Sequence, residues 1–426
     1  TPSIGEQSSH ETLNDSNTST SSSSEAYVDD KSPKAEFDER ASIAFKKFLT
    51  SSARLRFPDE KAPQISIILI FYNQAHLSLL CLQSILQYAD TPYQLIIIDN
   101  CSSDGTDQLL DRIENADIER NQENLGFVRA VNQAAELATG KTILLLNNDA
   151  LLEKQTLSNA LACIEADRGI GAVGAKIKLL DGRLQEAGSI IFSDGACLGY
   201  GRGQPADNPE FMFQRDVDYC SGAFLLFRRE TFTDLGGFDE DFAPAYYEES
   251  DFCIRLREQG LRIVYNPAVQ ITHYEFASSG GLSGALSLQA AHREILCSKH
   301  ENFLSKQFSN DPANYLRART SNTHPNVLVI DDRVPHPSLG VGYPRCSTFL
   351  HELSKLKLNI SFYPLLYPED SWDEIYTTLS KNIEVILNSG RDGLRSFLNQ
   401  RSDFYQFIVV SRVHNMEFFN HVLSSN

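Results

Sequence analysis

From Ile65 onward, short apolar runs rich in β-branched residues alternate with segments of helical periodicity. This alternation is typical of an α/β fold in which a parallel sheet carries helices on both faces. The pattern predicts strands and helices in turn at 65–70, 77–88, 94–98, 106–114, 127–137 and 142–146. After Leu146 the alternation loosens. A glycine-rich stretch then precedes an apolar run at 219–227, a helix from Glu248 and a closing helix at 285–308.

A second alternating unit begins at Asn326, after a polar linker. Its expected strands lie at 327–330, 359–363, 384–387 and 407–410. Because four repeats are fewer than a doubly wound domain usually contains, we interpret this unit as a partial Rossmann-like domain. The expected organisation is a disordered segment at 1–40, a helical linker at 41–62, an α/β domain at 63–308, a linker at 309–325 and a partial α/β unit at 326–426.

The first 40 residues are dominated by Ser, Thr, Asn, Asp and Glu. Such a segment buries too little apolar surface to offset its ordering entropy, so it is predicted to be disordered. The chain begins with Thr1, which indicates a segment excised from a longer protein.

The composition narrows the possible partners. With 56 Asp and Glu against 38 Lys and Arg, the formal net charge is −18, and such a surface repels nucleic acid. A small anionic ligand remains possible, because a bound metal ion can invert the local field. No apolar run approaches the ~20 residues of a membrane-spanning helix. The eight cysteines are widely spaced without a C-x-x-C pair, which favours a reduced, cytoplasmic compartment.

Two predicted strands end in carboxylates. The strand at 94–98 runs into Asp99 and a polar turn, and ligands of open α/β sheets bind beyond the carboxyl ends of the strands. In that turn, Ser103 and Asp104 are expected to be ordinary helix N-caps. The strand at 142–146 ends in Asn147-Asn148-Asp149, where oxygen ligands suit a divalent cation, although the same triplet alone more often forms a turn.

The helix from Glu248 carries three acidic residues in its first turn. A helical arrangement of ~100° per residue places Glu249 near the centre of the apolar face, so we expect its carboxylate to point inward. Glu248 and Asp251 lie on the adjacent side, where Asp251 can pair with Arg255 at i, i+4. An inward carboxylate is costly as mere structure but suits a general base. The lone His273, taken by itself, is more often a packed or surface residue than a metal ligand.

Together these residues resemble the inverting nucleotide-sugar glycosyltransferases of family 2, which have the GT-A fold, and especially their rhamnosyltransferase-like members. The resemblance covers roughly 63–305. It implies an α/β, Rossmann-like GT-A domain and hexosyltransferase activity. It also implies a nucleotide-sugar site formed by Tyr72, Asn73, Asp99, Asn124, Gly126, Asn132 and Asn148.

The same resemblance assigns roles to the acidic residues. It implies Mg²⁺ or Mn²⁺ held by Asp149 and His273, and Glu249 as general base in a motif with Glu248 and Asp251. At an ordinary pKa of about 4.3, Glu249 is ionised at neutral pH. Three departures stand out: Asn147 begins the metal motif, Glu249 stands where many relatives have Asp, and Ile70-Phe71 replaces the more usual Pro-Thr.

The implied substrates are a nucleotide-diphosphate sugar donor and a glycan or lipid-linked acceptor hydroxyl, in polysaccharide assembly. The expected location is cytoplasmic, with peripheral association at the inner face of the membrane left open. Residues 326–426 resemble the opening of a GT-B-type glycosyltransferase, whose donor nucleotide sits mainly on the other half, so no independent activity is expected of them.

Two alternatives stay open. A sugar nucleotidyltransferase should carry a Gly-rich, basic phosphate loop near the first strand, and residues 71–75 contain neither glycine nor a basic residue. A non-catalytic carbohydrate-binding or scaffolding module would bind glycan without metal.

Overall fold

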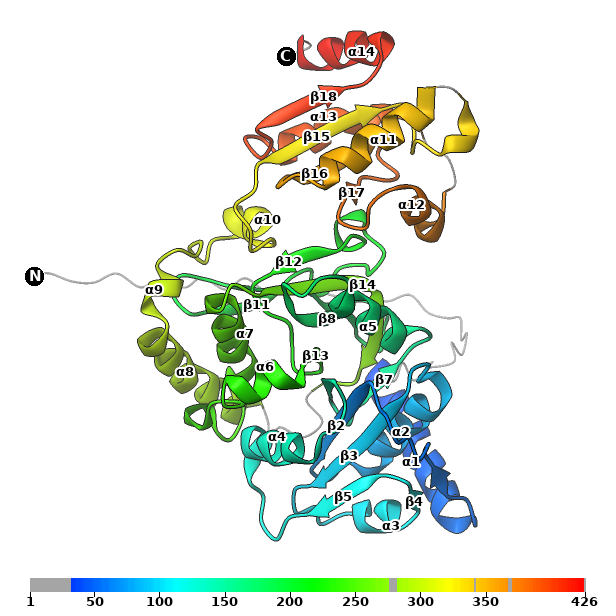
Figure 1. Cartoon of the computed structure of the whole chain (residues 1–426), viewed down its shortest axis with the longest axis vertical. Helices are drawn as coiled ribbons and strands as arrows, with labels where there is room; N and C mark the ends of the chain where they lie inside the picture. Colours follow the sequence, from blue (N-terminus) through cyan, green and yellow to red (C-terminus); the bar gives the residue numbers. More distant parts are fainter. Residues whose placement is uncertain (1–31, 276–281, 341, 367–369, 425–426) are drawn as a thin grey trace, which may run out of the picture.

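The computed structural model describes residues 32–275, 282–340, 342–366 and 370–424 (Figure 1). A large α/β domain carries a smaller α/β unit at one end, and helix α1 (Pro33–Thr50) packs beside α2 (Ala75–Tyr88). The sequence placed disorder up to residue 40, but α1 already begins at Pro33, where the Ser32 hydroxyl accepts a hydrogen bond from the Ala35 amide. The rest of that predicted segment, 1–31, lies outside the described residues.

The large domain is built on a ten-stranded mixed sheet of order β12-β14-β8-β13-β6-β2-β3-β5, with β7 paired to β14 and β9 to β8. Two short pairs, β1 with β4 and β10 with β11, lie outside it. The strands are β1 (Leu55–Arg56), β2 (Ile65–Phe71), β3 (Tyr93–Asp99), β4 (Ile113–Glu114), β5 (Asp117–Arg120), β6 (Thr142–Leu146), β7 (Ala150–Leu152), β8 (Ile170–Lys178), β9 (Leu184–Ala187), β10 (Ser189–Ile191), β11 (Cys197–Gly199), β12 (Arg215–Val217), β13 (Phe224–Arg228) and β14 (Arg262–His273).

Helices cover both faces of this sheet (Figure 1). Besides α1 and α2, they are α3 (Thr106–Leu110), α4 (Gly126–Leu137), α5 (Thr156–Ala166), α6 (Arg229–Asp234), α7 (Glu248–Glu258), α8 (Leu282–Lys299), α9 (Glu301–Leu304) and α10 (Tyr315–Ala318). Buried apolar side chains form one core cluster on each face. No helix among the described residues is long and apolar enough to cross a membrane.

The strands β2, β3 and β6 are parallel, as the alternating pattern predicted, and β5, which the pattern did not predict, adds a further parallel strand beside β3. The residues of β2, β3 and β6 are mostly apolar on both faces because helices cover both sides of the sheet, whereas β5 at the edge is polar and more exposed. Phe71 pairs with Asp99 across β2 and β3, and Ile68 pairs with Leu145 across β2 and β6. The polar residues that follow these strands therefore gather at one edge of the sheet.

The smaller unit is a four-stranded parallel sheet of order β17-β16-β15-β18, again with a core cluster on each face. Its first strand begins at Asn326, where the second unit was expected to start. Its elements are β15 (Asn326–Asp331), α11 (Gly342–Ser354), β16 (Asn359–Pro364), α12 (Trp372–Thr378), β17 (Glu384–Val385), α13 (Gly390–Gln400), β18 (Phe407–Val410) and α14 (Val413–Ser424).

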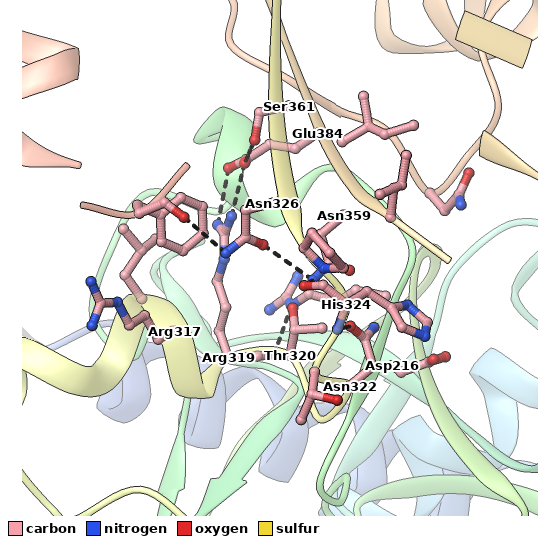
Figure 2. A pocket seen from close by; sticks show the side chains of 18 of the residues that line it. Asp216, Arg317, Arg319, Thr320, Asn322, His324, Asn326, Asn359, Ser361 and Glu384 are labelled. Carbon is pink, nitrogen blue, oxygen red and sulfur yellow. Dashed lines mark hydrogen bonds and ion pairs between the residues drawn. The ribbon is translucent and has the colours of Figure 1, made fainter. Parts of the chain in front are cut away.

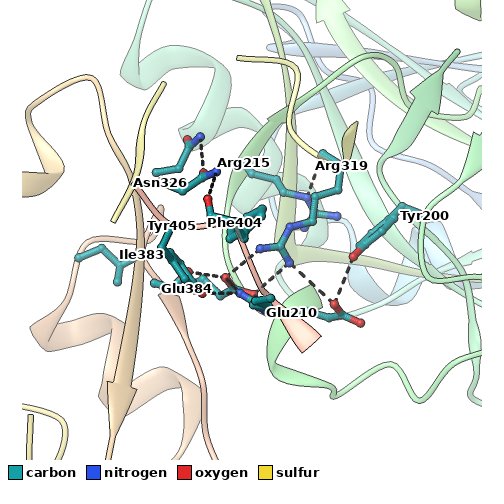
Figure 3. Close-up of polar contacts among 12 residues, drawn as sticks. Tyr200, Glu210, Arg215, Arg319, Asn326, Ile383, Glu384, Phe404 and Tyr405 are labelled. Atoms are coloured by element: carbon teal, nitrogen blue, oxygen red, sulfur yellow. Dashed lines mark hydrogen bonds and ion pairs between the residues drawn. The ribbon is translucent and has the colours of Figure 1, made fainter. Parts of the chain in front are cut away.

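A buried ion cluster joins the two units (Figure 3). Glu384 of β17 receives two hydrogen bonds from Arg319, which follows α10, at 2.8 and 3.0 Å. Arg401 donates two more at 2.7 and 2.8 Å, and the Ser361 hydroxyl adds one at 2.7 Å. Although burial alone raises the pKa of Glu384, the two guanidinium groups hold it well below its usual range.

A cavity of about 670 Å³ opens beside this cluster, between the amino ends of β15 and β16 and the edge strand β12. Figure 2 shows Asp216, Arg317 and His324 among its lining residues. Main-chain hydrogen bonds brace the junction next to it, from the Ser321 amide to the Asp216 carbonyl (3.0 Å) and from the Gln214 amide to the Lys381 carbonyl (2.7 Å).

We predict that Glu384→Gln destabilises the smaller unit by about 3–5 kcal/mol, because it removes the carboxylate that faces the buried guanidinium groups of Arg319 and Arg401 and leaves Arg319, among the described carboxylates, only Glu210, at 3.8 Å. Because folding lowers the pKa of Glu384, this contribution is present at neutral pH and is lost as the pH falls below about 4.5. Urea titration, followed by fluorescence of the only tryptophan, Trp372 of α12, measures the loss. Glu352→Gln, at an exposed site, is the control. Equal stability of the two variants would contradict the prediction.

Candidate functional site

The site lies where β2, β3 and β6 end, beside the end of β14 and the start of α7. Tyr72 follows β2 and is 36% exposed, whereas Asp99 at the end of β3 is 3% exposed. Asn73 has a left-handed backbone (φ 58°) and ties the two loops together. Its amide donates to the Ser102 hydroxyl, and its side-chain oxygen accepts from the Ser103 amide, both at 2.8 Å. Asp99 accepts a hydrogen bond from the Ser102 amide at 3.2 Å.

Ser103 and Asp104, the two residues expected to be helix N-caps, make different hydrogen bonds. Asp104 accepts hydrogen bonds from the Thr106 amide (3.0 Å) at the start of α3 and from the Ala75 amide (2.9 Å) at the start of α2. Ser103 caps neither helix, because its amide and hydroxyl donate to Asn73 instead. The loop after β3 is thus fixed against the loop after β2.

Asn124 and Gly126 shape the start of α4. The Asn124 side-chain oxygen accepts hydrogen bonds from the Asn100 side chain (2.8 Å) and from the Gly126 amide (2.9 Å). Gly126 has φ 77°, and a Cβ there would lie 2.6 Å from Cβ of Pro244. The Phe127 amide donates to the Pro244 carbonyl at 2.6 Å. Only glycine therefore lets α4 dock on the loop that leads into α7.

Asn132 was expected in the nucleotide-sugar site, but both ends of its amide hold the main chain of Phe238. Its Nδ2 donates to the Phe238 carbonyl (2.8 Å), and its Oδ1 accepts from the Phe238 amide (2.9 Å). This geometry gives Asn132 a positioning role for the loop at 235–238. This role could not be predicted from the sequence, because Phe238 lies 106 residues further along the chain than Asn132.

Asp149 and His273 meet at this edge although they lie far apart in the sequence. Nε2 of His273 lies 2.9 Å from Oδ1 of Asp149, and both side chains are buried. Burial alone raises the pKa of Asp149, but the charge and hydrogen bond of His273 outweigh it and hold that pKa below its usual value. Asn148 lies in the same turn and donates to the Ser78 hydroxyl at 2.9 Å.

Two neighbouring residues were missed in the sequence, Gln185 and Glu186 of β9. Oε1 of Gln185 lies 2.8 Å from Nδ1 of His273, which orients the ring so that Nε2 faces Asp149. Glu186 accepts hydrogen bonds from the Ser189 hydroxyl and the Ser221 amide, both at 3.0 Å. Burial raises the pKa of Glu186 above its usual value. Neither residue belongs to a recognisable motif in the sequence. Their position beside the site follows from the pairing of β9 with β8, which only the structure shows.

The donors at this position fit a divalent cation. Asp149 offers a hard carboxylate oxygen, and His273 offers an imidazole nitrogen whose other nitrogen is oriented by Gln185, as is usual for metal-bound histidines. Among the described residues, no group of three or more His, Cys, Asp and Glu side chains is placed to hold a metal. A metal here would take two protein ligands, which suits ions that complete their shell with substrate phosphates.

The first turn of α7 brings two buried carboxylates to the site. Tyr246 and Tyr247, just before the helix, both have left-handed backbones (φ 78° and 74°), a strained geometry for such residues. Glu248 is 5% exposed and Glu249 is partly buried. In both, the Oε2 atom is buried and has no hydrogen-bond partner among the described residues.

Burial raises the pKa values of both Glu248 and Glu249. It raises the pKa of Glu249 to about 7, with a further contribution from the charge of Glu186. It raises the pKa of Glu248 well above its usual value, and the neighbouring Glu249 adds to the effect. The expectation of an ordinary pKa for Glu249 was therefore wrong. Glu248, expected on the side adjacent to the apolar face, is buried as well, because α7 is buried on nearly all sides.

The side chain of Asp251 forms polar contacts that hold helix α7 in place. It pairs with Arg255 at 2.7 Å, the predicted i, i+4 pair, and its other oxygen lies 2.8 Å from Nε2 of His300. Arg255 in turn donates to the carbonyls of Leu235 and Gly237 at 3.0 and 2.9 Å. The network fixes α7 to the loop at 235–238, and it occupies both oxygens of Asp251.

Residues 66–236 match the family model described as Glycosyl transferase family 2. The O-antigen biosynthesis protein RfbC of Myxococcus xanthus is 28% identical over 235 residues, which cover 53% of this chain and 18% of that protein. The N-acetylglucosaminyl-diphospho-decaprenol L-rhamnosyltransferase of Mycobacterium tuberculosis is 28% identical over 247 residues, covering 50% of this chain and 78% of that protein. The chain thus spans less than a fifth of the length of RfbC.

Among solved structures, the mannosyltransferase PcManGT of Pyrobaculum calidifontis, in complex with GDP-Man and Mn²⁺, has a TM-score of 0.40 and 20% identity, covering 62% of this chain and 70% of that one. The predicted fold class, an α/β GT-A-type domain with a Rossmann-like sheet, is confirmed. The GT-B resemblance of 326–426 stays a prediction. Residues 66–236 are thus similar to the domain of glycosyl transferase family 2.

Proposed function

We propose that this chain transfers a sugar from a nucleotide-diphosphate donor to an acceptor hydroxyl, with inversion at the anomeric carbon. The observation that carries the proposal is the pair of buried glutamates at the start of α7, which share one edge of the sheet with Asp149 and His273. A buried carboxylate with a free oxygen and a pKa near 7 is poised to take up a proton at neutral pH.

The donor lies along the carboxyl ends of β2, β3 and β6, with its base against Tyr72 and Asp99. Asn73, Asn124 and Asn148 fix the loops around it through the hydrogen bonds described above. Asp149 and His273 would hold Mg²⁺ or Mn²⁺. When bound, that ion acts as a Lewis acid, which stabilises the negative charge on the leaving diphosphate.

Glu249 acts on the acceptor. Its carboxylate accepts the proton of the acceptor hydroxyl while the hydroxyl oxygen forms a bond to the anomeric carbon. The bond from that carbon to the diphosphate breaks on the opposite face, so the configuration inverts. The products are the glycoside and the nucleoside diphosphate, and the proton remains on Glu249. Burial raises the pKa of Glu248 well above its usual value, which favours its protonated form and reduces repulsion of the charge on Glu249.

Positioning residues support this geometry. Arg255 and Asn132 hold the loop at 235–238, while Gly126 allows α4 to contact the loop before α7. The acceptor class we favour is a glycan or lipid-linked saccharide of polysaccharide assembly. The support is the similarity to RfbC and to the rhamnosyltransferase, whose names refer to O-antigen and to a diphospho-decaprenol acceptor.

We predict that Glu249→Gln lowers turnover by about 10²- to 10⁴-fold, the usual contribution of a general base, while nucleoside diphosphate binding survives. The measurement is release of nucleoside diphosphate from a panel of UDP-, dTDP- and GDP-sugars, with binding followed by calorimetry. Glu258→Gln, exposed at the end of the same helix, should leave turnover unchanged. Turnover of Glu249→Gln near that of wild type would remove Glu249 as the base.

The pH profile provides a second prediction. Because a base must be ionised to accept a proton, kcat/KM should rise with pH through an apparent pKa of about 7, far above the 4.5 of an unperturbed glutamate. The measurement is initial rate between pH 5 and 9 with the donor that turns over. A rate that stays flat across this range, as expected of a glutamate with an ordinary pKa, would contradict this account.

A further inference from the structure

Helix α1 lies outside the region that matches the family, yet it reaches the Asp149–His273 pair. Nζ of Lys34, in its first turn, donates to the Glu275 carbonyl at 2.5 Å and lies 4.4 Å from the ring centroid of Tyr274. These two residues directly follow His273, and the Tyr274 amide donates to the carbonyl of Asp149 at 3.1 Å. Lys34 is thus anchored on the segment that forms the candidate metal site.

Several contacts fix α1 in this position. Oδ1 of Asp38 lies 2.8 Å from Nε2 of His76, which is in the first turn of α2 directly after the nucleotide loop. The ring of Phe37 lies 6.0 Å from that of Tyr274. Further along, the side chain of Arg112 donates to the carbonyls of Phe48 and Leu49 at 2.9 and 2.8 Å. Lys34 is therefore presented by an element that packs on the domain at both ends.

The guanidinium group of Arg202 adds a second positive charge beside Glu275. It lies in the glycine-rich turn after β11, and its Nη2 is 2.7 Å from Oε2 of Glu275. Glu275 therefore holds Lys34 through its carbonyl and Arg202 through its carboxylate. Its backbone is left-handed (φ 66°), which is uncommon for a glutamate.

The negative charge at this edge of the large sheet favours the positive side chains of Lys34 and Arg202. The described carboxylates here include Asp99, Asp149, Glu186, Glu248, Glu249 and Glu275, the last of which pairs with Arg202. A nucleoside diphosphate brings further negative charge, and one divalent ion offsets only part of it. His273 is already engaged with Asp149. Lys34 and Arg202 are long, partly exposed side chains whose present partners, a carbonyl and a single carboxylate, can be exchanged for phosphate oxygens.

We propose that Lys34 and Arg202 bind the diphosphate of the donor, which makes α1 part of the donor site. This inference rests on the proposed function, since it requires a nucleoside diphosphate at this edge. No covalent bond changes: Nζ of Lys34 and the Arg202 guanidinium give up Glu275 and donate charge-assisted hydrogen bonds to phosphate oxygens. As the products form, the same two groups face the leaving diphosphate.

The test compares Lys34→Met with Lys46→Met, a matched change at an exposed lysine of the same helix. The probes are UDP, dTDP and GDP with Mn²⁺, and the corresponding nucleosides without phosphate, measured by calorimetry on the full chain. A charged hydrogen bond contributes enough that Lys34→Met should bind the diphosphate about tenfold more weakly or worse. Nucleoside affinity should not change, and Lys34→Arg should recover most of the loss. Arg202→Met should show the same selective loss.

Three results would overturn the inference. One is equal diphosphate affinity of Lys34→Met and Lys46→Met. Another is an equal loss for nucleoside and diphosphate, which would mean that α1 only shapes the site. The third is a loss that Lys34→Arg does not recover. If wild-type protein binds none of the three nucleoside diphosphates, the proposed function itself fails, and that outcome is distinct from a change confined to the Lys34 variant.

Discussion

The parallel pairing of β2 with β3 and β6 is the constraint on which the rest of the site depends. It sets Phe71 level with Asp99 and brings the residues after β6 to the same edge. The three strands are buried on both faces, so a shift in register would exchange the side chains packed into the two cores and is disfavoured by the loss of close packing. β14 runs beside β8 to this edge, where its last residue, His273, pairs with Ala150 of β7. Asp149 and His273 meet because the sheet delivers both of them.

Burial then separates the acids of this edge into two kinds. Asp149 has a cationic partner in His273, which keeps its pKa low. Glu248 and Glu249 have no basic partner within the part of the chain that the structure describes, and burial raises the pKa of both. Titratable groups whose environments push their pKa values apart are suited to different tasks in one reaction. A low pKa suits a metal ligand, and a pKa near neutrality suits a base.

Local patterns in the sequence predicted the elements that frame the site. The apolar runs located β2, β3 and β6, and each ended in the polar residues that now line the edge. Side-chain roles that depend on distant partners were harder to predict. Asn132 holds Phe238 across 106 residues, and Gln185 orients His273 across 88. The helical periodicity predicted one buried face for α7, whereas the helix is buried on nearly all sides and Glu248 is buried with it.

The most direct test of the central claim is thermal denaturation of the full chain with UDP, dTDP and GDP, each with and without Mn²⁺. A ligand at ~100 times its dissociation constant stabilises a protein by about 2.7 kcal/mol, which raises the melting temperature measurably. The account predicts that one nucleotide stabilises the protein strongly with Mn²⁺ and weakly or not at all without it. No stabilisation by any nucleotide, in protein that melts cooperatively, would contradict a donor site at this edge of the sheet.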